Sequence, residues 1–384
     1  MAGRIRLIHL DVMRGIAILM VMGPHMPRES PDMSEALKVW HRGGWCGVDL
    51  FFVLSGFLIG GLLFDEYLDT GAIRFGRFVI RRGFKIWPSY VAFLIFGFIT
   101  LAGEQPGNIA RASMGTLVDI WPNLLQVQNY FAGPFPHTWS LAVEEHFYLL
   151  LPLVLMGMIA QNRRHSGGDA FRWLPGLVLG VALICMGARI MTAALIRPFN
   201  LYIHFFPTHL RIDSLLFGVL LAYIVRFRAK WVDWLRPFTA LVFLASTAIF
   251  LPPFLFDLGN TPWLFAAWPA ALAVGSGGFV LLAWFSSRQN PRSKNPLVRI
   301  LAGIGVYSYS IYLWHVALAQ MISHQIPARG PRWGIAPVAL GYVVLAITIG
   351  ALVFWLIEQP MLAIRNRIFP SPSDTPLAVG SVRA

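Results

Sequence analysis

The chain has 384 residues, of which 57% are hydrophobic and only 13% are charged, a balance far outside that of soluble globular domains. Apolar runs of about 20 residues recur along it and predict a polytopic helical membrane protein. The net charge of +13 is therefore assigned to cytoplasmic loops and to contact with anionic membrane lipid, and no nucleic-acid partner is expected. Two cysteines, Cys46 and Cys185, exclude a disulfide framework and a cysteine-based metal site.

We expect an all-α bundle of about ten transmembrane helices in one domain, residues 1–370, followed by a tail, 371–384, predicted to be disordered. The predicted spans are 8–26, 46–64, 86–102, 139–159, 173–195, 209–227, 236–256, 263–286, 300–322 and 334–357. With the N-terminus inside, the inner segments hold 21 of the 31 Lys and Arg residues and the outer segments hold 7. This asymmetry predicts that both termini are cytoplasmic.

The first predicted span carries charge where a span should be apolar. Arg14 and His25 are eleven residues apart, just over three helical turns, so they share one stripe about 16 Å long. Asp11 lies three residues before Arg14 and can pair with it. Pro24 indicates a bend or an end at His25. One interpretation is that Arg14 and His25 extend to the inner and outer membrane interfaces and have no functional role. The other is a functional site, the usual meaning of charge within a span.

The inner segment after the second span is the most basic one. Arg74 and Arg77 precede Arg81, Arg82 and Lys85 there, and the last two are three apart and share a helix face. They are ordinary cytoplasmic anchors or a clamp for a phosphorylated cytosolic ligand. The glycines of the second span, such as Gly56, are expected to let helices approach closely.

The fourth predicted span starts with an acidic pair. The preceding outer segment, 103–138, has the length of a lid or a re-entrant cap. Glu144 shares a helix face with Ser140 and Tyr148, whereas Glu145 points elsewhere. Glu144 and His25 are expected at similar depth, and a histidine oriented by a carboxylate is a typical general base. The alternative is a buried glutamate satisfied by a nearby arginine.

The later spans carry polar residues that we interpret mainly as structural. Arg211 and Asp213 are expected to form a charge pair, the alternative being that they line an acceptor site, and Arg189 needs a partner. His315 is expected to be a satisfied bundle residue, and Glu358 a structural residue at the inner interface. The histidine spacing matches no metal motif, so no metal site is predicted.

Seven segments together carry a resemblance to a known family. In chain order they are LDVMRGIAILMVMGPH, GVDLFFVLSGFLIG, FVIRRGFKIWP, WSLAVEEHFYLLLP, LRIDSLLFGVLLA, YSYSIYLWH and FWLIEQP. The chain resembles the acyltransferase 3 family of integral-membrane acyltransferases, of the O-antigen acetylase type. The family's Arg-x10-His pair falls on Arg14 and His25, and its basic Arg-x-x-Arg element falls on Arg82 and Lys85. That lysine keeps the charge but loses the bidentate geometry of arginine.

The family's Trp-Ser-Leu-x-x-Glu element falls on Trp139, Ser140, Leu141 and Glu144, which favours Glu144 over Glu145. The resemblance implies transfer of an acyl group, typically acetyl from cytosolic acetyl-CoA, to a hydroxyl of a cell-envelope carbohydrate at the outer face of a bacterial inner membrane. Some relatives add a soluble esterase-like domain. None is expected here, so the chain would work alone or with a separate periplasmic partner.

The resulting hypothesis gives each candidate residue a role. The catalytic candidates are His25, Glu144 and Arg14. The acyl-CoA donor, a co-substrate and not a tightly bound cofactor, would be held by Arg81, Arg82, Lys85 and Asp11. The acceptor would be held by Trp139, Ser140, Tyr148, Arg211 and Asp213. His25 would act as a base or become acylated itself.

Two other functions fit the sequence. Charge on several spans is also typical of a lipid or sugar transporter, although no inverted repeat is visible. An acyltransferase that acts on a small molecule, such as a macrolide or an antibiotic sugar, is equally consistent with the motifs.

Overall fold

The computed structural model describes residues 7–27, 33–103, 118–164, 168–256, 262–291, 293–326 and 334–370, and these contain helices and no strand. The helices of the first half are α1 (Ile8–Met22), α2 (Glu35–Gly43), α3 (Gly47–Thr70), α4 (Phe75–Gly103), α6 (Trp139–Arg164), α7 (Leu174–Leu195) and α8 (Leu201–His204). Those of the second half are α9 (Ile212–Phe227), α10 (Ala229–Leu235), α11 (Thr239–Phe250), α12 (Pro252–Leu255), α13 (Pro262–Gln289), α14 (Pro296–Gln325), α15 (Ile335–Val353) and α16 (Gln359–Ile368).

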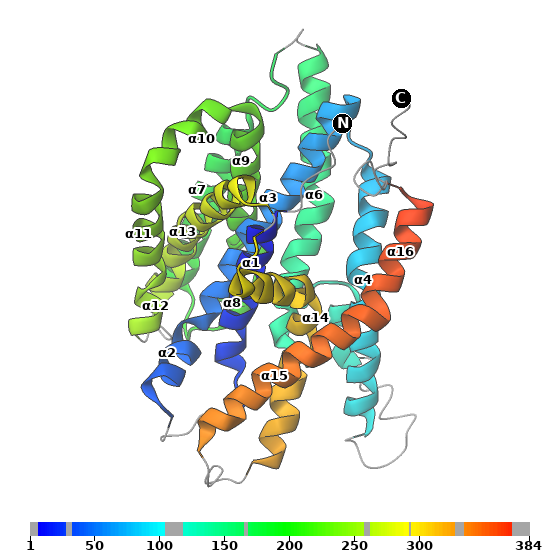
Figure 1. The fold of residues 1–384 in the computed structure, drawn as a ribbon, viewed down its shortest axis with the longest axis vertical. Helices are drawn as coiled ribbons and strands as arrows, with labels where there is room; N and C mark the ends of the chain where they lie inside the picture. Colours follow the sequence, from blue (N-terminus) through cyan, green and yellow to red (C-terminus); the bar gives the residue numbers. More distant parts are fainter. Residues whose placement is uncertain are drawn as a thin grey trace.

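The predicted helical membrane bundle is confirmed. Within the described residues, eight helical stretches are long and apolar enough to cross a membrane. The two other predicted spans, 8–26 and 209–227, correspond to the shorter helices α1 and α9, of 15 and 16 residues. Both are packed inside the bundle, between longer helices (Figure 1).

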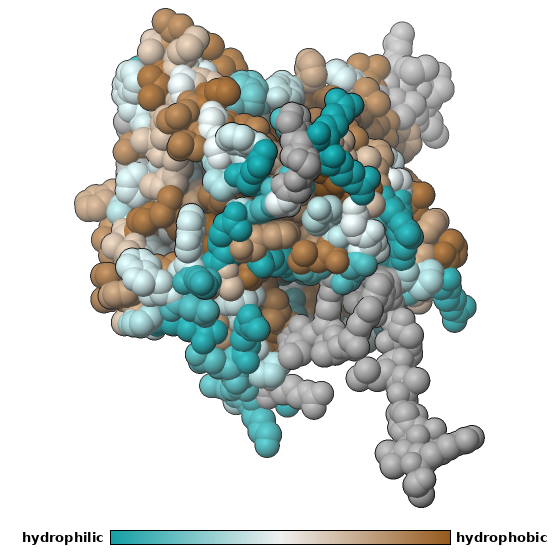
Figure 2. Space-filling model, turned by 90° about the horizontal axis from the view of Figure 1, so that it is seen from above, coloured by the Kyte–Doolittle hydropathy of each residue, from teal (hydrophilic) through white to brown (hydrophobic). Residues whose placement is uncertain are grey.

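The burial pattern suits a lipid environment. Large apolar side chains such as Ile184 on α7, Leu244 on α11 and Leu340 on α15 are exposed, whereas Arg189 and Arg211 are fully buried. Helices in lipid are held together by close packing and polar contacts, because the lipid tails are as apolar as leucine. On the face seen from above, hydrophilic residues form a band that crosses the middle and reaches the lower edge, and hydrophobic residues lie mainly on either side of it (Figure 2).

Glycines lie at two close helix crossings. α1 meets α14 at Gly15 and Gly305, where a Cβ added to Gly305 would lie 1.9 Å from the carbonyl oxygen of Asp11. α3 meets α9 at Gly56 and Gly218 with equally little space. The expectation that Gly56 serves helix packing is confirmed. α1 packs against both α14 and α3.

Helices extend into two segments that lie outside the predicted spans. The basic segment was expected to precede a span that starts at residue 86, but α4 begins at Phe75, so Arg77, Arg81, Arg82 and Lys85 lie on the helix itself. Part of the expected outer loop between the first two spans forms the short helix α2. In both places helical geometry continues past the apolar run, because Lys and Arg are themselves good helix formers.

The structure describes part of the segment before α6. The predicted lid spans residues 103–138, of which 104–117 lie outside the described residues. Residues 118–124 are helical. Gln128 then donates to the carbonyl oxygen of Thr138 at 3.0 Å, and Asn123 to the Thr138 hydroxyl at 2.9 Å. The described part is therefore pinned to the start of α6. The predicted tail, 371–384, also lies outside the described residues.

Candidate active site

A cavity of about 440 Å³ lies among α1, α3, α4, α6 and α14. Its volume falls in the range of small-molecule sites. Seven of the twelve predicted site residues line it: Asp11, Arg14, Arg82, Lys85, Ser140, Glu144 and Tyr148. The fold therefore brings together residues that the sequence separates by more than 130 positions. The five others, His25, Arg81, Trp139, Arg211 and Asp213, do not line it.

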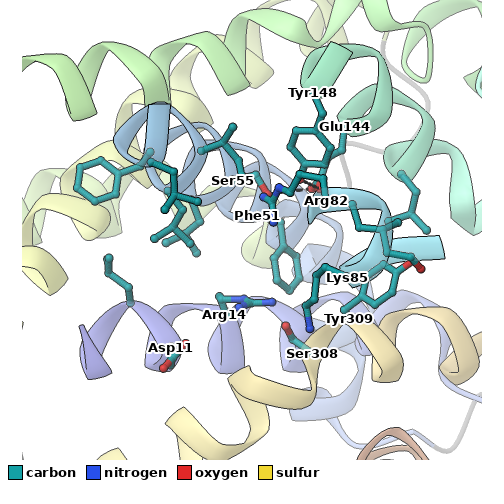
Figure 3. Close-up of a pocket in the computed structure, with 18 of the residues that line it drawn as sticks. Asp11, Arg14, Phe51, Ser55, Arg82, Lys85, Glu144, Tyr148, Ser308 and Tyr309 are labelled. Carbon is teal, nitrogen blue, oxygen red and sulfur yellow. Dashed lines mark hydrogen bonds between the residues drawn. The ribbon is translucent and has the colours of Figure 1, made fainter. Parts of the chain in front are cut away.

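Three cations from two helices face the cavity. Arg14 comes from α1, and Arg82 and Lys85 come from consecutive turns of α4 (Figure 3). No described residue forms a hydrogen bond or ion pair with Arg14. The guanidinium of Arg82 lies over the ring of Tyr148 at 4.7 Å, and its buried Nε has no hydrogen-bond partner among the described residues. Part of this positive charge is therefore available to an anionic ligand.

Lys85 is held by a buried acid. It forms an ion pair with Glu358, whose side chain is 1% exposed and whose other oxygen accepts from the Ser310 hydroxyl. Glu358 ends the π-helical turn Phe354–Glu358 between α15 and α16. Such wide turns are frequent at functional sites. Glu358 was predicted to be a structural residue at an interface, and the structure places it against the wall of the cavity.

Arg81 points away from this group. It lies one position before Arg82 on α4, and its guanidinium donates to the carbonyl oxygen of Phe369, after α16. Neighbouring residues differ by about 100° around a helix, so Arg81 and Arg82 cannot share a face. The predicted clamp of three α4 cations is reduced to Arg82 and Lys85 at the cavity, with Arg14 facing them from α1.

Glu144 lies on the face of α6 that the spacing predicted. Its carboxylate accepts from the Tyr148 hydroxyl one turn later, and from Ser55 on α3 at 3.1 Å. Ser140, one turn earlier, donates to the hydroxyl of Tyr312 at 2.6 Å, because that hydroxyl gives its own proton to the carbonyl oxygen of His137. Glu145 also lines the cavity, although the sequence favoured another interface for it.

His25 has a different partner from the one expected. It ends the short 3-10 turn Gly23–His25 after α1, and its Nδ1 lies 3.0 Å from the Val21 carbonyl oxygen and 3.3 Å from Nε2 of His315. The pairing with Glu144 is absent from the described hydrogen bonds, because Glu144 is bound to Ser55 and Tyr148. The expected similarity in depth was not sufficient to bring the two together.

A histidine cluster, formed by His25, His137 and His315, lies beyond Tyr312. The ring of His315 is 5.0 Å from that of His25 and 5.7 Å from that of His137. Tyr312 lines the cavity on one side, and its ring lies 5.6 Å from the His315 ring on the other. Tyr312 therefore contacts both the cavity and the histidine cluster.

The predicted acceptor residues outside the cavity have structural partners. Arg211 pairs with Asp49 at 2.6 Å, and Asp213 pairs with Arg189 at 2.9 Å, all nearly fully buried. The predicted Arg211–Asp213 pair is therefore wrong, because residues two apart at the start of a helix point to opposite sides. Asp213 is the partner that Arg189 was expected to need. Trp139 is buried and stacks on an aromatic ring close to these pairs.

Sequence reasoning missed three residues that complete the site. Ser55 and Tyr312 carry hydroxyls at the cavity, and His137 belongs to the histidine cluster. Their position along the chain is the signal that could have found them: Ser55 and Tyr312 lie in motif segments, and His137 lies two residues before one. Among the described residues, no group of three or more His, Cys, Asp or Glu is placed to hold a metal ion.

Comparison with known proteins identifies the family. Residues 7–355 match the family described as an acyltransferase domain. A Staphylococcus aureus (strain COL) protein whose curated name gives it as a candidate O-acetyltransferase is 29% identical over 378 residues, covering 91% of this chain and 56% of the relative. The peptidoglycan O-acetyltransferase OatA of Listeria monocytogenes is 26% identical over 367 residues, covering 92% of this chain and 55% of the relative.

The O-acetyltransferase OatA of Staphylococcus aureus (strain NCTC 8325) is 28% identical over 335 residues, covering 82% of this chain and 51% of the relative. The chain thus spans about half the length of the curated relatives it matches. No solved structure matches it. The family match covers the cavity, the α4 cations and the histidine cluster alike, and the chain belongs to the acyltransferase domain family.

Proposed function

We propose that the chain is a membrane O-acyltransferase that moves an acetyl group from cytosolic acetyl-CoA to a hydroxyl of a cell-envelope glycan at the outer face of the bacterial inner membrane. The observation that carries the proposal is the convergence of Arg14, Arg82 and Lys85 on one cavity inside a helical membrane bundle. Curated relatives named as O-acetyltransferases, one of them for peptidoglycan, support the acetyl group and the glycan.

The donor would enter from the end of the bundle where α1 begins. Leu7 before α1, Asp65 near the end of α3 and Arg226 near the end of α9 line the cavity there. The phosphates of coenzyme A would replace water around Arg82 and Lys85, since charge-assisted bonds to phosphate are stronger than neutral ones. The pantetheine arm would follow the apolar wall past Arg14 and bring the thioester toward Ser140 and Tyr312.

The acceptor would approach on the histidine side of Tyr312. Its hydroxyl oxygen attacks the thioester carbonyl carbon, the carbon–sulfur bond breaks, and the hydroxyl proton goes to His25 and then to the departing thiolate. General base catalysis of this kind is worth about 10²- to 10⁴-fold in rate. Tyr312 lies between the two substrates and must turn aside for them to meet. Glu144 orders Ser55 and Tyr148 at the cavity wall.

Acetyl transfer by the purified full chain in lipid nanodiscs tests the proposal, with radiolabelled acetyl-CoA and a peptidoglycan-derived acceptor. Replacement of His25 by Ala should lower turnover at least about 100-fold, because the base is lost. His209→Ala is a matched control, since His209 is an exposed histidine outside the histidine cluster, and its ring stacks on Tyr130. Near-normal turnover in His25→Ala would remove the catalytic assignment.

Ligand binding separates the enzyme from the transporter alternative. Acetyl-CoA should raise the thermal unfolding midpoint of the chain by several degrees, and Arg82→Gln should abolish that shift. A transporter of an unrelated substrate would show neither effect. If the chain acetylates a small-molecule hydroxyl and no glycan, the acceptor is a small molecule and the glycan part of the proposal is wrong.

A further inference from the structure

The buried histidine His315 contacts the ring of His25. It lies on α14, is fully buried, and its Nε2 is 3.3 Å from Nδ1 of His25. Its own Nδ1 is 2.7 Å from the carbonyl oxygen of Tyr312, one turn earlier. The two rings meet edge to face at 79°. His315 therefore bridges its own backbone and the ring of His25.

These partners assign the protons on both rings. A carbonyl oxygen only accepts, so Nδ1 of His315 must donate to Tyr312, and Nε2 of a neutral His315 is an acceptor. The carbonyl oxygen of Val21 likewise requires a proton on Nδ1 of His25. That N–H then faces both Val21 and Nε2 of His315, a shared hydrogen bond. The remaining nitrogen of His25, Nε2, is left without a proton and with its lone pair available.

The surroundings keep His315 in this orientation. His137 packs on it with ring planes at 87°, and Nε2 of His137 is 3.2 Å from the carbonyl oxygen of Leu313 on the same helix. Tyr312 contacts the ring as well and donates to the His137 backbone. No carboxylate among the described residues contacts His25 or His315. A buried ion without a counter-charge is costly, so the neutral rings are the species that fit.

We propose that His315 is a positioning residue, which fixes the tautomer and the orientation of His25 so that Nε2 of His25 takes the acceptor proton. This inference rests on the proposed function. During transfer the proton of the acceptor hydroxyl goes to Nε2 of His25, and the new cation is stabilised because its Nδ1–H already donates to Val21 and His315. The proton returns to the sulfur of the coenzyme A leaving group, and the histidine pair is restored.

A pair of polar substitutions separates this role from simple packing. In His315→Gln the side-chain oxygen can accept from Nδ1 of His25 near the position of Nε2. In His315→Asn the shorter side chain places its amide only near the position of the His315 Nδ1 atom, so it cannot accept from His25. Both remove the ring, so a packing role predicts similar losses in the two variants. A positioning role predicts that Gln keeps kcat within about fivefold, whereas Asn lowers it about 10- to 100-fold with the KM for acetyl-CoA unchanged.

His204 is a matched control for burial. It is 3% exposed, and its two ring nitrogens lie 2.9 and 3.1 Å from carbonyl oxygens, away from the histidine cluster. His204→Asn should lower the unfolding midpoint and leave kcat per folded molecule unchanged. If it lowers kcat as much as His315→Asn does, the loss at His315 reflects general destabilisation and the inference is overturned.

A double-mutant cycle completes the test on the full chain in nanodiscs. If His315 acts through His25, then His25→Ala with His315→Asn should be no slower than His25→Ala alone. An inactive His25→Ala together with a fully active His315→Asn would overturn the positioning role and leave the proposed function intact. An active His25→Ala would overturn the catalytic assignment, and the inference about His315 with it.

Discussion

Lys85 and Glu358 form a buried ion pair that joins α4 to the π-helical turn before α16. The acid is 1% exposed, whereas the lysine side chain is 19% exposed at the edge of the cavity. The pair therefore serves two purposes: it neutralises a buried glutamate, and it holds one cation of the proposed phosphate site in place. An anionic donor would compete with Glu358 for the same ammonium group.

Replacement of Glu358 by Gln should destabilise the protein and change its response to the donor. Loss of one partner of a buried pair costs about 3–5 kcal/mol, reduced here because Lys85 reaches the cavity. Acetyl-CoA should restore part of the unfolding midpoint, since its phosphates supply the missing negative charge. Thermal unfolding with and without acetyl-CoA measures both effects. The exposed pair Glu35–Lys38 is the control, and Glu35→Gln should cost less than about 1 kcal/mol.

Arg82 should control donor affinity more strongly than Arg81 does. Arg82→Gln removes a guanidinium at the cavity, and a lost charge-assisted bond costs about 1.5–3 kcal/mol, or roughly 10- to 150-fold in the KM for acetyl-CoA. Arg81→Gln removes a cation that lies outside the cavity and contacts the Phe369 backbone, and it should leave that KM within about twofold. Initial-rate kinetics over a range of acetyl-CoA concentrations decides between them. Equal effects would mean that the donor phosphates lie outside the cavity.

The buried pairs near α9 should affect stability and not acceptor recognition. Arg211 is fully buried and bound to Asp49, so Asp49→Asn leaves an uncompensated charge and should cost about 3–5 kcal/mol of unfolding free energy. Turnover per folded molecule and the KM for the glycan acceptor should not change. A raised acceptor KM with an unchanged unfolding midpoint would instead support the acceptor role considered from the sequence.

The crossing of α1 and α14 should tolerate no side chain at Gly305. A Cβ there would lie 1.9 Å from the backbone oxygen of Asp11, so Gly305→Ala forces the two helices apart and should cost about 2–3 kcal/mol or more. Gly303 on the same helix has no atom within 4 Å of an added Cβ, and Gly303→Ala should be neutral or slightly stabilising. Chemical or thermal unfolding of both variants gives the comparison.

Much of the site was predictable because it depends on local spacing. Glu144 and Tyr148 share a face of α6 as their four-residue separation required, and Arg82 and Lys85 face one cavity for the same reason. His25 and Glu144 did not meet, since similar depth in a bundle leaves the rotation and the neighbours of each helix open. Arg211 pairs with Asp49, 162 residues away, and not with Asp213, two residues away in the sequence.

The sequence by itself determined the membrane class, the helices, the basic end of the bundle and the stripe that carries Arg14, because apolar length, charge asymmetry and helical period are properties of short segments. Only the tertiary structure decided the partners: Glu358 for Lys85, Asp49 for Arg211 and His315 for His25. Each of these contacts joins residues at least 160 positions apart, and which helix faces which is set by packing at glycine crossings that no single segment reveals.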